Sequence, residues 1–252
     1  MSNQNPLEDF RVFLTLVWEH LGLPPPTQRQ LEIAHYLQHG PRRSIIQAFR
    51  GVGKSWITSA FVVWCLLLNP TLNIVVVSAS KSRSDDFSTF TMRLIQDMPI
   101  LRSLQPRGDQ RNSKISFDVG PAPASHQPSV KSFGITGMMT GSRADLIIAD
   151  DIETPLNSAT QAQRDKLYEL VKEFDAILKP NGSIKYLGTP QNELSLYAEL
   201  TNRGYQTLIW PARFPNAAWM KANGPRLAPR LAREFEEHPE LSGSPTDAGR
   251  FD

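Results

Sequence analysis

The feature of this sequence that most constrains its fold is a set of short, almost wholly apolar runs. Two of them read LNIVVVSAS, at 72–80, and ADLIIAD, at 144–150. Runs of this kind are typical of parallel strands that helices cover on both faces. Along most of the chain such predicted strands alternate with segments whose apolar residues have helical spacing. The alternation predicts an α/β fold, with N-terminal helices followed by a mostly parallel, doubly wound sheet that has helices on both faces.

The predicted elements follow this alternation along the chain. Helices are predicted at 5–23, 27–40, 53–69, 82–99, 158–178 and 194–200. Strands are predicted at 43–49, 72–80, 114–119, 130–135, 144–150, 183–189 and 205–211. We expect Thr27 to open the second helix and Ser158 to cap the fifth. From about Pro215 the sequence is polar and rich in proline, which predicts a linker or tail with little material for a core.

Composition argues against several classes of protein. The 252 residues carry a formal net charge of only +2, so charge alone does not indicate nucleic-acid binding. The single cysteine, Cys65, excludes an internal disulfide, and the sequence has no Cys/His cluster for zinc. No apolar run reaches the ~18 residues that a membrane span needs, and the N-terminus lacks a signal-peptide pattern. We therefore expect a cytoplasmic protein that is not inserted in a membrane.

The strongest chemical signal is the stretch AFRGVGKS, which begins at Ala48 between a predicted strand and a predicted helix. It fits the phosphate-binding pattern G-x-x-x-x-G-K-[ST], except that Ala48 replaces the first glycine. Gly51 and Gly53 allow the backbone to approach phosphate oxygens closely, and the amides that start the helix would point at them. Lys54 can reach the β and γ oxygens, and the hydroxyl of Ser55 can bind magnesium. The alternative is an ordinary strand–loop–helix turn with a surface lysine.

A second signal is the stretch ADLIIADDIE, in which an apolar strand ends in Asp150 and Asp151. A P-loop hydrolase needs one carboxylate for the magnesium shell and a second to polarise the attacking water. Asp150 suits the first role and Asp151 the second, with the longer Glu153 as the reserve candidate for the second. An acidic turn after a strand is common, but together with the P-loop it indicates ATP hydrolysis. The strand in KYLGTPQN ends near Thr189, whose hydroxyl could sense the γ-phosphate.

Together these motifs resemble the ATPase domain of the large terminase subunit of tailed bacteriophages, most closely the short-tailed-phage subgroup often called DNA maturase B. Four pieces carry the resemblance in the family's order: PTQRQLEIAHYL, FRGVGKSW, GSRADLIIADDIE and YLGTPQN. IWPARFP and RLAPRLAREFEEHPEL extend it nearly to the end of the chain. The resemblance implies a P-loop NTPase fold of the ASCE, RecA-like class, which has an extra strand between its two Walker motifs. We expect residues 72–80 to be that strand.

The resemblance also implies a division of the chain into three parts. These are an N-terminal helical segment with the adenine-side motif at 1–40, a P-loop ATPase core at 41–214, and a linker or tail at 215–252. In the family, the tail leads to a C-terminal nuclease with its own acidic metal cluster. No strand-borne acidic triad follows residue 210. We therefore expect a shortened chain without nuclease activity.

The resemblance assigns nucleotide binding to particular residues. In the family, a glutamine upstream of the P-loop reads adenine; Gln30 matches it best, and Gln28 is second. The P-loop residues that would bind nucleotide are Arg50, Gly51, Val52, Gly53, Lys54, Ser55 and Trp56. Arg50 would contact the γ-phosphate of its own subunit's nucleotide. Ser55 and Asp150 would hold the metal.

Other roles concern catalysis and assembly. Many terminases have Asp-Glu where this chain has Asp-Asp, so the catalytic carboxylate is either Asp151 or Glu153. Thr189 falls in the family's coupling motif, which links hydrolysis to domain movement. Arg143, just ahead of the second Walker strand, would be an arginine finger that completes a neighbouring subunit's site. The alternative is a surface arginine at the start of a strand.

The activity that the resemblance implies is an ATP-driven motor, with Mg²⁺ as cofactor, that translocates double-stranded DNA into a procapsid in the host cytoplasm. Its implied partners are double-stranded DNA, the portal protein, the procapsid, the small terminase subunit and further copies of the chain. Those copies would form a ring, expected to be a pentamer, although the isolated domain could be a monomer. A modest excess of basic residues between Lys81 and Lys114 could contact DNA phosphates. The alternatives are a helicase-like ATPase on single strands, for which no second motor lobe is evident, and a nucleotide-binding assembly module with little turnover.

Overall fold

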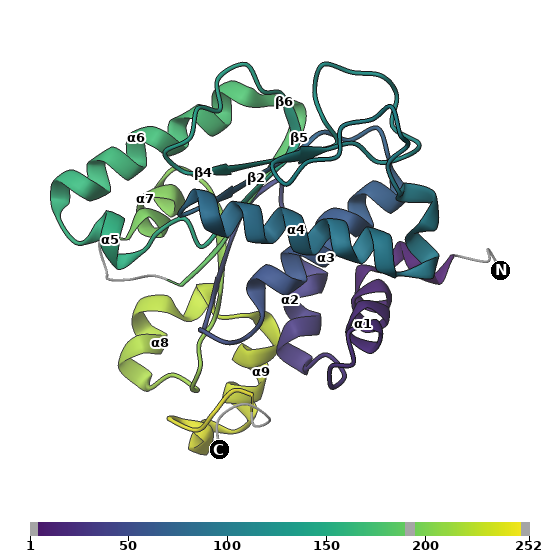
Figure 1. Ribbon diagram of the computed structural model, residues 1–252. Coiled ribbons are helices and arrows are strands. Elements are labelled where there is room, and N and C mark those ends of the chain that lie inside the picture. The colour runs from purple at the N-terminus through teal and green to yellow at the C-terminus, as the bar shows by residue number, and fades with distance from the viewer. Residues whose placement is uncertain (1–4, 190–194, 248–252) are drawn as a thin grey trace.

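The computed structural model describes residues 5–189 and 195–247 of the chain. The described strands form a seven-stranded sheet in the order β3-β4-β2-β5-β6-β1-β7, in which only β3 pairs antiparallel with its neighbour. This sheet crosses the molecule (Figure 1). The strands are β1 (Arg43–Ala48), β2 (Ile74–Ser78), β3 (Ser116–Phe117), β4 (Val130–Gly134), β5 (Ala144–Asp150), β6 (Leu178–Gly188) and β7 (Gln206–Trp210). The prediction of a mostly parallel α/β sheet is confirmed.

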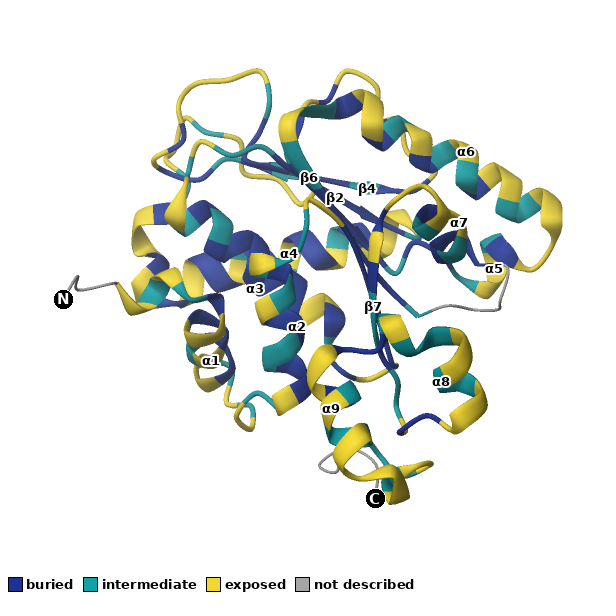
Figure 2. Cartoon of the chain, turned by 180° about the vertical axis from the view of Figure 1, so that it is seen from behind, coloured by how far each residue is buried: buried dark blue, intermediate teal, exposed yellow. Residues whose placement is uncertain are grey.

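Helices cover both faces of this sheet (Figures 1 and 2). One face packs against α1 (Phe10–His20), α2 (Gln28–His39), α3 (Lys54–Leu68) and α4 (Lys81–Asp97), and the other against α6 (Gln161–Ile177) and α7 (Leu196–Asn202). The remaining helices are α5 (Pro155–Ser158), α8 (Ala217–Asn223) and α9 (Pro229–Glu237). The described residues also form short 3₁₀ helices, which are η1 (Pro6–Glu8), η2 (Pro99–Leu104), η3 (Gly224–Arg226) and η4 (Pro239–Leu241). No helix in the described part of the chain is long and apolar enough to cross a membrane.

The two faces of the sheet bury separate hydrophobic clusters, which explains why β2 and β5 have apolar side chains on both faces. In β5, Leu146 and Ile148 join the cluster on the side of α1 to α4. Ile147 and Ala149 join the cluster on the side of α6 and α7. Successive side chains of a strand point to opposite faces, so a strand with one solvated face would alternate with polar residues. The apolar runs therefore mark strands in the middle of the sheet.

Strand β6 separates the P-loop strand from the strand that carries the acidic pair. It pairs with β1 on one side and with β5 on the other. The expectation that residues 72–80 supply this extra strand is wrong, because β2 pairs with β4 and with the opposite edge of β5. Each parallel pairing needs a crossover, here a helix, so order along the chain does not give order in the sheet. The strand inserted between β1 and β5 places the fold in the ASCE, RecA-like class of P-loop NTPases.

Thr27 and Ser158 were both predicted to cap helices, and only the prediction for Thr27 is confirmed. Thr27 caps α2 in a capping box with Gln30, as the sequence predicts. The prediction that Ser158 caps the long helix after β5 is wrong. Ser158 is the last residue of α5, and Thr160 caps α6 in a capping box with Gln163. Pro155 suits the first turn of a separate short helix, which divides the predicted segment in two.

The segment after Pro215 folds back onto the domain. Leu227 and Leu231 are 3% and 0% exposed and belong to the larger hydrophobic cluster. Phe235, one further turn along α9, stacks on Phe214 with ring centroids 6.4 Å apart. The prediction of a tail with little core material is therefore wrong for the described residues up to 247. The segment is polar overall, but its apolar residues on and just before α9 recur every four positions and form a stripe on one side of the helix. The domain boundaries at 40 and 214 stay predictions.

Candidate nucleotide-binding site

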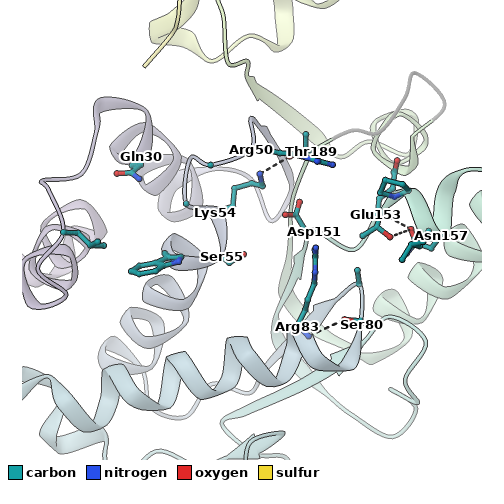
Figure 3. Close-up of a pocket in the computed structure, with 18 of the residues that line it drawn as sticks. Gln30, Arg50, Lys54, Ser55, Ser80, Arg83, Asp151, Glu153, Asn157 and Thr189 are labelled. Carbon is teal, nitrogen blue, oxygen red and sulfur yellow. Dashed lines mark hydrogen bonds between the residues drawn. The ribbon is translucent and has the colours of Figure 1, made fainter. Parts of the chain in front are cut away.

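The predicted motifs meet in one cleft at the carboxyl ends of the parallel strands (Figure 3). The cleft has a volume of about 970 Å³. Its lining includes Arg50, Ser80, Asp151 and Thr189, which follow β1, β2, β5 and β6. In open α/β sheets, ligands bind in a crevice outside the carboxyl ends of the strands. The sheet thus brings together residues that are as far as 139 positions apart along the chain (Arg50 to Thr189).

The loop between β1 and α3 has the backbone conformation that its glycines allow. Gly51 and Gly53 have φ of 88° and 87°, in the left-handed region that other residues rarely adopt. At Gly53 a Cβ would also lie 3.3 Å from Nε2 of Gln30. Because Gly53 precedes α3 without a capping side chain, the first amides of the helix are available to an anion. This arrangement fits a phosphate cradle.

Gln30 braces this loop from α2. The residue is 1% exposed, its Nε2 donates to the carbonyl of Val52 over 2.9 Å, and its Oε1 accepts from the amide of Thr27 over 2.9 Å. Val52 is buried and joins the site through this carbonyl. Gln28 lies exposed on the first turn of α2. Gln30 lines the cleft, and its contact with adenine stays a prediction.

Lys54 lies buried at the base of the cleft. Its Nζ donates to the carbonyls of Ala48 and Phe49 over 3.1 and 3.2 Å, and to Oγ1 of Thr189 over 3.0 Å. The hydroxyl of Thr189 donates to the carbonyl of Ala48 over 3.0 Å. Burial lowers the pKa of Lys54, and the nearby Asp151 and Asp150 oppose that shift. Thr189, the predicted coupling residue, is thus in direct contact with the P-loop lysine.

Ser55 and Asp150 join the two Walker motifs. The Ser55 hydroxyl donates to Oδ2 of Asp150 over 2.6 Å. Oδ1 of Asp150 is buried and accepts no hydrogen bond from any other described residue. Burial raises the pKa of Asp150 to about 6, while the hydrogen bond from Ser55 acts in the opposite direction. A buried carboxylate oxygen without a partner is unfavourable unless a cation or proton joins it.

The donors at this point fit a magnesium ion. A hydroxyl and a carboxylate are hard oxygen ligands, and Mg²⁺ in nucleotide sites takes one or two protein ligands and fills the remaining positions with phosphates and water. In the described part of the chain, no group of three or more His, Cys, Asp or Glu side chains could hold a metal by itself. The site therefore has the composition expected where a nucleotide supplies the remaining ligands.

Asp151 and Glu153, the two candidates for the catalytic carboxylate, have different surroundings. Both line the cleft. Asp151 has φ of 47°, and its amide donates to the carbonyl of Leu187 over 2.8 Å. A left-handed conformation at an aspartate is uncommon, and residues held in such conformations cluster at functional sites. Glu153 is 1% exposed, and its Oε2 accepts from the amide of Leu196 over 2.7 Å, which ties it to the start of α7.

The two predicted arginines lie at opposite ends of the parallel strands. Arg50 lines the cleft and lies beside Thr189 (Figure 3). Arg143 immediately precedes β5, at the end of the strand opposite Asp150, and is exposed. Its Nη1 donates to the carbonyl of Ser142 over 3.0 Å. Arg143 is thus outside the cleft of its own chain.

Some residues that line the cleft were not predicted. Ser80 and Arg83 come from the start of α4, and Trp18 from α1, where its ring lies 6.4 Å from that of the predicted Trp56. Trp56 is 42% exposed, a large fraction for a tryptophan. The sequence SASKSR does follow an apolar strand directly. Its relevance depends on β2 lying next to β5, which the sequence does not reveal.

The chain is 53% identical to the large terminase subunit of Enterobacteria phage T3 in an alignment of 263 residues. The alignment includes all of this chain and 45% of the relative, so the chain spans a little under half of the relative's length. No protein-family model matches the chain.

Solved structures with a similar arrangement include two viral ATPases. The ATPase domain of the Thermus phage P74-26 large terminase is 15% identical, with 87% of this chain and 88% of that chain covered and a TM-score of 0.46. The N-terminal domain of the DNA packaging ATPase from bacteriophage phi29 is 13% identical, with 64% and 80% covered and a TM-score of 0.43. The sequence identity to the phage T3 protein decides the assignment. The resemblance seen in the motifs is confirmed, and over its whole length this chain is a homologue of the phage terminase large subunit.

Proposed function

We propose that this chain is the ATPase motor region of a DNA-packaging terminase, which hydrolyses Mg-ATP to move double-stranded DNA into a procapsid. The observation that carries the proposal is the 2.6 Å hydrogen bond between Ser55 and Asp150, because it joins the P-loop to the buried strand that ends in carboxylates. The 53% identity to a terminase large subunit supports the choice of DNA packaging among the many uses of this fold.

The residues of the cleft divide the reaction among them. The amides at the start of α3 and Lys54 bind the phosphates. Ser55 and Asp150 would hold the magnesium ion, which when bound would supply positive charge against the charge that develops on the phosphates. Arg50 adds a permanently charged fork at the γ-phosphate of its own subunit's nucleotide. Thr189 contacts Lys54 directly, so it is placed to transmit the state of the nucleotide to β6.

We assign the catalytic carboxylate to Asp151. Its backbone conformation directs it at the cleft immediately after the metal-binding candidate, where it can orient the attacking water and accept its proton. Glu153 already accepts a hydrogen bond from Leu196 and fixes the start of α7. This contact makes Glu153 the weaker candidate.

The proposed partners follow from the packaging function. They are double-stranded DNA, the portal protein and procapsid, the small terminase subunit, and further copies of the chain in a ring, which we propose is a pentamer in the host cytoplasm. In such a ring, Arg143 acts on a neighbour's nucleotide. Its exposed position, away from its own cleft, supports this assignment.

Lys54→Ala provides the direct test. Turnover of Mg-ATP should fall about 10²-fold or more, because the lysine contacts the phosphates on which charge develops. Lys172→Ala is the matched control, since this lysine is exposed on α6, where it pairs with Glu169 and lies over the ring of Tyr168, away from the cleft. Steady-state hydrolysis is measured without DNA, with duplex DNA and with single-stranded DNA, and circular dichroism checks folding. Wild-type turnover by a folded Lys54→Ala protein would overturn the site.

The same assay separates the other functions. Stimulation by duplex DNA supports a packaging motor. Stimulation by single strands alone would indicate a helicase-like ATPase. Tight binding of ATP with negligible turnover under every condition would indicate an assembly module.

A further inference from the structure

Arg83 lies at the cleft but has no part in the function proposed above. It belongs to the first turn of α4, whose cap is Ser80: the Ser80 hydroxyl accepts a hydrogen bond from the amide of Arg83 over 3.4 Å. Strand β2, which leads into this turn, pairs with β5 so that Ser78 lies opposite Asp150. The cap and the strand pairing together fix Arg83 one strand away from the metal-binding candidate.

The side chain of Arg83 points at the carboxylates. It extends from α4 toward Asp151 in the close-up of the cleft (Figure 3). It lines both the main cleft and an adjoining cleft of about 470 Å³, which it shares with Ser55, Asp150 and Asp151. Its charge is also one of the influences that lower the pKa of the buried Asp150. Arg83 therefore stands at the boundary between the two clefts.

Two other basic residues of α4 are used differently. Lys81 pairs with Asp85 over 2.6 Å, and Arg93 lies 3.8 Å from Asp97, so each has a carboxylate one turn further along its own helix. The exposed Asp86 and the buried Phe87 occupy the positions three and four residues after Arg83, and Asp86 lines the adjoining cleft with it. Among the described residues, the Arg83 guanidinium takes part in no ion pair or hydrogen bond. Its fork is therefore available to a ligand in the cleft.

We propose that Arg83 is a third phosphate-binding cation of this site, which contacts the γ-phosphate of ATP in its own subunit from the side of α4. The inference rests on the proposed ATPase function. Arg50 and Lys54 belong to the P-loop side of the cleft, whereas Arg83 extends into it from α4 (Figure 3). Phosphoryl transfer spreads charge over three equatorial oxygens, so cations on more than one side stabilise the transition state. The planar guanidinium suits paired contacts to phosphate oxygens.

Nucleotide affinity tests this placement without depending on turnover. Isothermal titration calorimetry measures binding of ADP and of a non-hydrolysable ATP analogue, both with Mg²⁺. Arg83→Ala should weaken binding of the analogue about 10-fold, which corresponds to about 1.4 kcal/mol, and leave ADP affinity within about 2-fold because ADP has no γ-phosphate. Arg83→Lys should lose part of this affinity, since a point charge replaces the fork. Arg93→Ala, on the same helix, is the matched control and should leave both affinities unchanged.

Four other outcomes would overturn the inference. Equal loss of ADP and analogue affinity, or a lowered melting temperature in both Arg83 variants, would make Arg83 a structural residue. Unchanged nucleotide affinities with weakened duplex binding would make it a DNA contact. If the wild-type protein binds neither nucleotide, the proposed function itself fails, and the wild-type titration shows this before any variant is compared.

Discussion

At the scale of single residues, the carboxylates after β5 differ in what already holds them. The carboxylate of Asp150 accepts a hydrogen bond from Ser55, and that of Glu153 accepts one from the amide of Leu196. Asp151 lines the cleft, and its backbone amide donates to the carbonyl of Leu187. A carboxylate that a neighbouring backbone amide already uses is a poorer general base, because the hydrogen bond stabilises its ionised form. Substitution of Asp151 should therefore affect hydrolysis, whereas substitution of Glu153 should affect mainly the stability of the fold.

Asp151→Asn should retain ATP binding and lose hydrolysis by about 10²-fold or more, because the amide cannot accept the proton of the attacking water. Glu153→Gln should hydrolyse ATP at nearly the wild-type rate but unfold more easily, by about 1–2 kcal/mol, because its hydrogen bond to Leu196 weakens. Turnover and nucleotide affinity are measured for both, with urea unfolding. Loss of turnover in a stably folded Glu153→Gln protein would exchange the two roles.

The titration of Asp150 gives a pH dependence with a definite sign. Burial raises the pKa of its carboxyl from 3.8 to about 6, so between these values the folded protein binds more protons than the unfolded one. In the absence of metal, the free energy of unfolding should then fall as pH rises through this window, by up to about 1.4 kcal/mol per pH unit. Asp150→Asn should remove the slope. Urea unfolding in EDTA from pH 4 to 7 measures it; an equal slope in the variant would refute the assignment.

At the scale of elements, the buried Arg29 of α2 forms an ion pair with Glu234 of α9. Arg29 is 6% exposed, forms ion pairs with Glu32 and Glu234, and donates from Nε to the carbonyl of Thr246 over 2.9 Å. The next residue of α2 is Gln30, which holds the P-loop. The same turn of helix thus contacts both the phosphate loop and the segment that follows the sheet.

Arg29→Ala should lower the free energy of unfolding by about 2–4 kcal/mol, because two carboxylates and a carbonyl lose a buried partner. The estimate stays below the upper range for buried pairs, since the Glu234 side chain is 29% exposed. Arg230→Ala removes an exposed partner of the same Glu234 and should change stability by less than about 1 kcal/mol. Urea unfolding compares the two variants. Equal losses would mean that the α2–α9 contact is not held by Arg29.

At the scale of the whole molecule, the sheet keeps Arg50 and Arg143 apart. Arg50 lines the cleft at the carboxyl ends of the strands, and Arg143 lies at the amino end of β5. We therefore expect Arg50 to act on the nucleotide of its own chain and Arg143 to act on a nucleotide bound by another copy of the chain.

Arg50→Ala should therefore lower turnover in the isolated chain, whereas Arg143→Ala should matter only when subunits assemble on procapsids. Mixing Arg143→Ala subunits with Lys54→Ala subunits should restore part of the activity, because the second variant cannot hydrolyse ATP but still donates Arg143 to a neighbour. The measurement is the ATPase rate on procapsids against the mixing ratio, with the wild-type protein mixed with Lys54→Ala as the reference. Absence of rescue at every ratio would place Arg143 in its own chain's fold or site.

The local parts of this protein could be predicted from its sequence. The residues of the P-loop and the acidic turn lie close together within their own motifs, and the capping box of Thr27 and Gln30 spans only four residues. Apolar runs marked β2 and β5, since burial on both faces favours apolar residues at successive positions. These features depend on backbone geometry and burial over a few residues.

Only the tertiary structure decided which strands are neighbours in the sheet and which side chains meet in the cleft. β6 enters between β1 and β5 although it comes after both in sequence, and β2 beside β5 brings Arg83 to the carboxylates. The helix that opens with Pro229 packs on the core although its composition predicted a tail. The pairing of parallel strands and the docking of a short amphipathic helix depend on surfaces distant in the chain, so no local pattern encodes them.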